Sequence, residues 1–121
     1  MNPRLAVELE KRRYAPGETV RGTVSVAEGG RSRSLDASLQ YKEETEDYEE
    51  VAISIPGGRL NEGDLVSGAS FEFELALPEE ALPNCRSAHG KLYWEVDVKS
   101  DEPGRDSHAR HRVDVRVRPR T

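Results

Sequence analysis

Apolar residues alternate with polar ones through almost the whole chain, and this period of two constrains the fold more than any other feature. Leu5, Val7 and Leu9 are separated by polar or small residues. A half-buried β-strand has this pattern because successive side chains point to opposite faces. The alternation recurs in six further runs and so predicts about seven strands; these runs are residues 20–26, 35–41, 51–55, 71–77, 92–98 and 109–117.

The breaks between these runs are rich in turn-forming residues. Pro16-Gly17 suits a type II turn, because proline presets φ and glycine accepts a positive φ. We expect residues 35–41 and 51–55 to form a hairpin, with Pro56-Gly57-Gly58 ending its second strand. Residues 59–69 form a connection with one weak strand candidate near Leu65. Short strands with a break every 8–12 residues favour an all-β, immunoglobulin-like antiparallel β-sandwich.

Length and composition limit the chain further. A chain of 121 residues fits one domain, residues 1–121, and a hydrophobic fraction of 35% allows only a thin core. No apolar run approaches the ~18 residues of a transmembrane helix, and residues 1–14 lack the apolar region of a signal peptide. Cys85 is the only cysteine, which excludes an intrachain disulfide. We therefore expect a soluble cytoplasmic protein without membrane insertion.

Charge is strongly segregated within a net charge of -5. Residues 41–80 contain 2 basic and 12 acidic side chains, concentrated in residues 42–50. This stretch is either a solvated hairpin end or a recognition surface. It would repel duplex nucleic acid, and the sequence has no global basic footprint, so no nucleic-acid partner is expected.

The histidines and turn acids do not form a persuasive metal site. His108 and His111 are three residues apart, which in a strand sends their side chains to opposite faces. His111 falls on the apolar face and is predicted to be a core or boundary residue. Asp101, Glu102 and Asp106 are interpreted as solvated turn acids, because they lack the ligand spacing of a calcium loop. A metal-dependent enzyme built from these groups remains a remote alternative.

Catalytic motifs are missing from the sequence. It contains no phosphate-binding glycine loop and no G-x-S-x-G elbow. Cys85 precedes Arg86 and is either a mildly activated thiol or a plain loop cysteine. The prediction is that the protein is not an enzyme and has no catalytic residues, cofactor or metal.

Two stretches carry a family resemblance. Residues 14–24, YAPGETVRGTV, and the strands and LP-rich loop of residues 71–98 together resemble the amino-terminal domain of the arrestin-like superfamily, in particular its α-arrestin and bacterial sporulation-control branches. The resemblance implies an arrestin-like topology and a non-catalytic interaction or scaffold module with a protein partner. Gly22 lies within the first motif, where a glycine relieves crowding beside another backbone.

The chain also departs from the family pattern. Family members usually have two tandem sandwiches, whereas these residues account for one, and the Pro-Pro-x-Tyr motif of α-arrestins is missing. The resemblance therefore does not imply receptor desensitisation. Whether another chain supplies a second sandwich stays open.

Two kinds of working surface are expected. Sheet edges can accept an extra strand from a partner, including a second copy in a homodimer, although charged edge residues can equally serve to prevent aggregation. The alternative surface is a phosphate or anion site at Lys11, Arg12 and Arg13, which resemble the basic stretch through which some arrestins meet phosphorylated partners.

The last two strong runs are predicted to form an antiparallel hairpin. Keeping both apolar sets on one face requires opposed residue numbers with an odd sum, and charge pairing favours a sum of 205 or 207 over 209. In either favoured register at least two arginines of the stripe Arg110, Arg112, Arg116 and Arg118 already have partners, so this arginine stripe is predicted to be mainly structural. Residues 116–120 would then form a freer basic tail.

Overall fold

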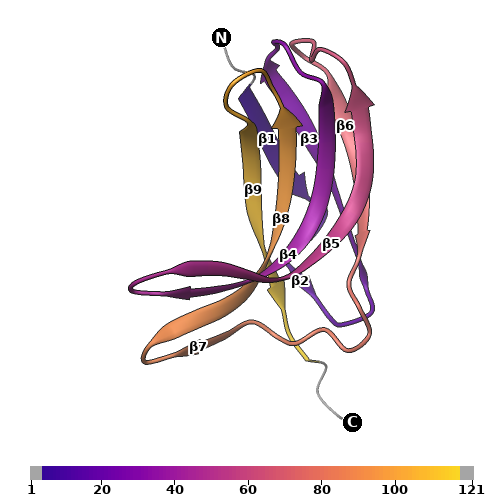
Figure 1. The fold of residues 1–121 in the computed structure, drawn as a ribbon. Coiled ribbons are helices and arrows are strands. Elements are labelled where there is room, and N and C mark those ends of the chain that lie inside the picture. Colours follow the sequence, from indigo (N-terminus) through magenta and orange to yellow (C-terminus); the bar gives the residue numbers. More distant parts are fainter. Residues whose placement is uncertain (1–3, 118–121) are drawn as a thin grey trace.

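Two packed β-sheets make up the computed structural model, which describes residues 4–117 (Figure 1). The smaller sheet has the order β1-β3-β6, and the larger has the order β2-β9-β8-β4-β5, with β7 also paired to β8. Among the described strands, only β2 and β9 pair in parallel. The strands are β1 (Arg4–Leu9), β2 (Arg13–Tyr14), β3 (Thr19–Glu28), β4 (Ser34–Thr45), β5 (Glu49–Glu62), β6 (Ser70–Ala76), β7 (Cys85–Ser87), β8 (Gly90–Asp101) and β9 (Ser107–Val115).

The predicted all-β sandwich is confirmed, with nine strands within residues 4–117 instead of about seven. The two additional strands, β2 and β7, are two and three residues long and are too short to show an alternation of their own. The described residues contain no helix long and apolar enough to span a membrane.

The core fills the space between the sheets with the residues that the alternation predicts to be inward. Trp94 is fully buried, and its indole N–H donates to the carbonyl of Leu82 over 2.7 Å. Its ring lies 4.9 Å from that of Tyr41, measured between centroids. The other side chains in the most deeply buried group are Val20, Val24, Val26, Leu35, Leu39, Leu75, Val96, Val98, Ser100, Val113 and Val115.

The Pro16-Gly17 turn has the predicted geometry. Gly17 has a φ of 87°, and the Glu18 N–H donates to the Ala15 carbonyl over 3.1 Å. A positive φ at the third position together with this bond defines a type II turn.

The predicted end of the second hairpin strand at residues 56–58 is wrong, because β5 continues to Glu62. Pro56 is tolerated since β5 is an edge strand and its missing N–H need not pair. A register shift between Ala37 and Ser38 of β4 accommodates the glycines that follow. A Cβ at Gly57 would come within 1.9 Å of the Leu75 side chain, so the glycine lets β5 pass close to the core.

Two predictions about polar residues are also wrong. His111 occupies the predicted inward position in β9 but is exposed, and its Nδ1 lies 2.8 Å from the Arg112 carbonyl oxygen. Glu102 is not a solvated turn acid, because only 3% of its surface is exposed. One of its oxygens accepts from the Ser107 hydroxyl over 2.9 Å, which holds the side chain under the β8–β9 turn.

The β8–β9 hairpin is confirmed in the register with a sum of 207. Asp97 opposes Arg110 and Glu95 opposes Arg112. Arg110 lies 3.6 Å from Asp97, so the arginine stripe is paired as predicted. Arg116 is not free, since it binds Asp114 at 3.1 Å, and the rest of the predicted tail, residues 118–120, lies outside the described residues.

We predict that Gly22→Ala destabilises the sandwich. A Cβ at Gly22 would lie 2.6 Å from both the Glu8 carbonyl oxygen and the Phe73 ring, so β1 and β6 would have to shift. Overpacking of this kind costs about 1–3 kcal/mol. Urea unfolding measures the loss, and Ser25→Ala, at an exposed position of the same strand, is the control. Equal stability of the two variants would contradict the close packing at Gly22.

Candidate interaction surfaces

The larger sheet extends beyond the smaller one as an arm, defined here as residues 42–52 of the β4–β5 hairpin and residues 85–92 of the β7–β8 hairpin (Figure 1). The arm exists because the sheets differ in length. β4 and β8 have 12 residues each, whereas β1 and β6 have 6 and 7. At about 3.3 Å per residue, the longer strands reach well past the end of the core.

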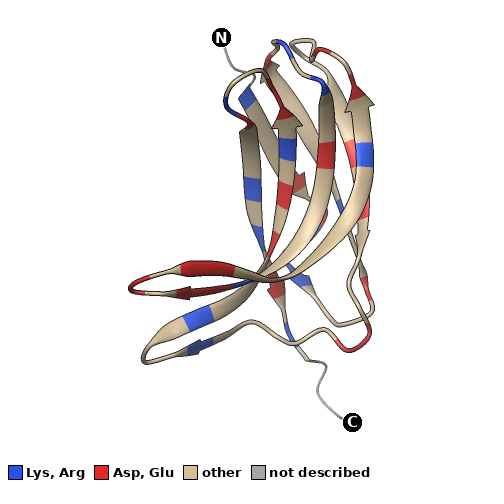
Figure 2. Cartoon of the chain, in the orientation of Figure 1, with Lys and Arg blue, Asp and Glu red and all other residues tan. Residues whose placement is uncertain are grey.

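The end of the β4–β5 hairpin is strongly acidic (Figure 2). This acidic tip comprises residues 43–50. The Tyr48 hydroxyl donates to Glu43 over 3.1 Å, and Tyr48 itself is 49% exposed. Glu46, Asp47 and Glu50 form no ion pair with any residue of the described chain. The predicted acidic hairpin end is exposed over residues 46–50, whereas Glu43 and Glu44 are half-buried.

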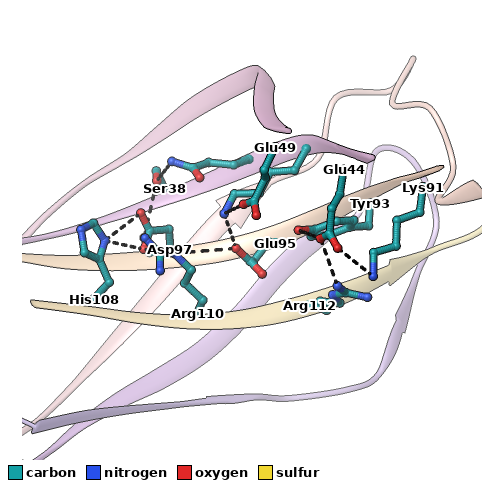
Figure 3. A network of polar contacts seen from close by, with 12 residues as sticks. Ser38, Glu44, Glu49, Lys91, Tyr93, Glu95, Asp97, His108, Arg110 and Arg112 are labelled. Carbon is teal, nitrogen blue, oxygen red and sulfur yellow. Dashed lines mark hydrogen bonds and ion pairs between the residues drawn. The ribbon is translucent and has the colours of Figure 1, made fainter. Parts of the chain in front are cut away.

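One face of the arm and the adjoining sheet carries a network of buried charges (Figure 3). Lys42 has only 6% of its side chain exposed and lies 2.7 Å from Glu95 and 3.2 Å from Glu49. Burial opposes the charge on Lys42, but the hydrogen bonds from its ammonium to Glu95 and Glu49 outweigh burial and raise its pKa. The lysine thus ties β8 to both strands of the β4–β5 hairpin.

Glu44 forms a second centre of the network (Figure 3). Lys91 lies 3.4 Å and Arg112 3.8 Å from its carboxylate, and the Tyr93 hydroxyl donates to it over 3.2 Å. Partial desolvation raises the pKa of Glu44. The hydrogen bonds from Lys91 and Tyr93 and the charge of Arg112 together lower this pKa by more than desolvation raises it, so the net shift is downward. Arg112 also stacks on the Tyr93 ring at 4.1 Å.

A groove of about 630 Å³ lies between β7 and the end of β9. Its cations are Arg86, Lys91, Arg112 and Arg116, and its one lining acid is Asp114. Leu92 and Val117 add apolar surface, and Val117 is 64% exposed. We call this feature the basic groove.

The predicted anion site does not converge on one point. Lys11 pairs with Glu18 and lies over the Tyr14 ring, whereas Arg13 pairs with Asp114 at 3.5 Å. Arg12 is exposed and forms no ion pair within residues 4–117. The three cations therefore reach different neighbours.

Cys85 begins β7 and is exposed at the rim of the basic groove. Burial raises the pKa of the Tyr41 hydroxyl, and its proximity to Cys85 raises it further. Among the described residues, no group of three or more His, Cys, Asp or Glu side chains is arranged to hold a metal ion.

The fold with its paired sheets is that of an arrestin-like β-sandwich, as the sequence motifs imply. It is similar to the crystal structure of the sporulation control protein Spo0M from Bacillus subtilis, with a TM-score of 0.68 and 23% sequence identity. The match covers 96% of this chain and 50% of that one, so the chain spans about half the length of this solved neighbour. No protein-family model and no curated protein matches the sequence.

We predict that Lys42→Met destabilises the protein by about 3 kcal/mol, because it leaves Glu95 buried without its closest partner. The double variant Lys42→Met/Glu95→Leu recovers most of this loss, since no buried charge remains unpaired. Urea unfolding of both variants provides the comparison. If the double variant were less stable than the single one, the buried pair would be contributing more than its desolvation costs.

A second prediction concerns acid. The pKa of Glu44 is lower in the folded protein than its ordinary value of 4.5, so the unfolded chain takes up the proton first as pH falls. Its contribution to stability is complete above pH 4.5 and is lost as pH falls through the lowered pKa. Unfolding measured between about pH 6 and pH 3 should therefore show a weaker pH dependence for Glu44→Gln than for the wild type. Parallel curves would contradict this role for Glu44.

Proposed function

We propose that the chain is a non-catalytic, arrestin-like module that binds another protein by strand addition to the edge of β5. The observation that carries the proposal is the open edge itself. β5 has 14 residues and ends the larger sheet, and within the described residues no strand pairs with its outer side. An edge of this kind presents unpaired backbone N–H and C=O groups to a partner strand.

The open part of the edge is residues 49–55. Pro56 and the irregular segment after it protect the remainder, because proline and register shifts discourage pairing. Val51 and Ile53 are 44% and 41% exposed, so an added strand would gain apolar contacts as well as backbone bonds. Partner recognition would therefore combine backbone hydrogen bonds with apolar side-chain contacts.

The proposal includes a single domain, residues 1–121, that acts in the cytoplasm. The exposed, unpaired thiol of Cys85 supports this location, because cytosolic thiols are kept reduced. The physiological partner is another protein, and a homodimer through the same edge is a special case.

An anion site at Lys11, Arg12 and Arg13 is the second candidate. The exposed Arg12 guanidinium, which has no acidic partner in the described chain, favours it. Salt-sensitive binding of phosphopeptides would support this function. Binding that survives charge reversal at all three positions would exclude it.

We predict that Ile53→Lys abolishes partner binding, because a charge on the exposed edge discourages strand addition. The matched control is Val66→Lys, at a loop position that is 71% exposed and lies outside the arm. Affinity purification from the native host with wild type and both variants, followed by mass spectrometry, makes the comparison. A partner retained by wild type and Val66→Lys but lost with Ile53→Lys fits the proposal. Equal recovery with all three baits contradicts it.

A further inference from the structure

Two neighbouring surfaces of the arm carry opposite charge that the molecule leaves unneutralised (Figure 2). On the acidic tip, Glu46, Asp47 and Glu50 have no ion pair within the described chain. In the basic groove, Arg86 likewise has none among residues 4–117. The surplus charges of the two surfaces are therefore complementary.

The other groove cations outnumber the acids that they contact. Lys91 and Arg112 share the single carboxylate of Glu44. Arg116 shares Asp114 with Arg13, at 3.1 Å and 3.5 Å respectively. Each pair of cations thus retains about one positive charge that an incoming carboxylate can neutralise.

Exposed apolar side chains accompany both surfaces. Tyr48 lies on the acidic tip and Val51 directly follows it, whereas Val117 lines the basic groove. Leu82, which is also exposed, lies beside Pro83 at the groove wall. Apolar contact that excludes water strengthens ion pairs at its margin, so the two surfaces match in both respects.

Within its own molecule, the acidic tip meets the groove cations through Glu44 alone among the described ion pairs; Glu46, Asp47 and Glu50, farther along the tip, form none. β4 is paired with β8 as far as Thr45 and Gly90, and the buried Lys42 ties both strands of the tip to β8. These contacts hold the tip extended, away from the sandwich (Figure 1). The groove charge that Glu44 and Asp114 leave over is therefore available to another molecule.

We propose that this molecule is a second copy of the chain, whose acidic tip docks in the basic groove of the first. The tip ends the arm, and the groove runs from the β7–β8 part of the arm to the end of β9. A two-fold axis can therefore let both contacts form at once, as an isologous dimer requires. The inference goes beyond the proposed function, because it assigns a second contact surface and does not depend on strand addition at β5.

The dimer should be weak and sensitive to salt. Exposed ion pairs contribute little individually, so we expect a dissociation constant of about 100 μM at low salt. At 1 M salt, where the Debye length is about 3 Å, the dimer should dissociate.

Charge exchange between the two surfaces provides the test. The tip variant is Glu46→Lys/Asp47→Lys, and the groove variant is Arg86→Glu/Arg116→Glu. Glu8→Lys/Glu10→Lys, at exposed positions in β1 and directly after it, is the matched control for the change in net charge. Sedimentation equilibrium from about 10 μM to about 1 mM measures association, and circular dichroism verifies that each variant is folded.

The proposal predicts that wild type and control dimerise, that each arm variant alone is monomeric, and that an equimolar mixture of the two arm variants forms heterodimers. Only reciprocal tip–groove contacts restore attraction in that mixture. A wild type that is monomeric at 1 mM and low salt overturns the proposal but leaves strand addition at β5 untouched. A dimer that persists in both arm variants and is lost with Ile53→Lys also overturns it, and assigns the contact to the β5 edge.

Discussion

The long antiparallel pairing of β4 with β8 is the interaction on which the remaining features depend. It continues without a register shift from Ser34 paired with Asp101 to Thr45 paired with Gly90. Its first part places Tyr41 against Trp94 in the core, and its last part forms the centre of the arm. A shift of one residue would expose the core face and bury the charged one, so this single register fixes both.

The charged face of the larger sheet is stable because its members satisfy one another. Lys42 neutralises Glu95, and Asp97 lies 3.0 Å from the ring nitrogen of His108 and 3.6 Å from Arg110 (Figure 3). Buried charges are costly when alone and tolerable when paired and hydrogen-bonded. The network therefore stiffens the base of the arm at little net gain in stability, and it keeps the tip in the extended position that the proposed dimer requires.

The sequence predicts those parts of the structure that depend on local periodicity. The inward set around Trp94, the turn at Pro16-Gly17 and the β8–β9 register follow from alternation, turn chemistry and charge pairing. The arm does not, because it arises from a difference in length between two sheets whose strands are far apart in the sequence. The burial of Lys42 was also missed, since alternation gives the face of a side chain but not what lies over it. For the same reason, alternation predicts the correct face of β9 for His111 but not that its side chain is exposed there.

At the basic groove, one residue satisfies backbone groups that the strand arrangement would otherwise leave unpaired. β8 changes neighbours along one edge, from β9 at Trp94 to β7 at Leu92, and such a gap leaves backbone groups unpaired. Asn84 fills it: its amide donates to the Val113 carbonyl over 2.8 Å, and its carbonyl accepts from the Trp94 N–H over 3.1 Å. Because Asn84 satisfies this backbone from within the chain, the groove is not a site that needs another strand. The groove still offers unneutralised positive charge and exposed apolar surface. We therefore expect side chains of a partner, and not its backbone, to occupy the groove.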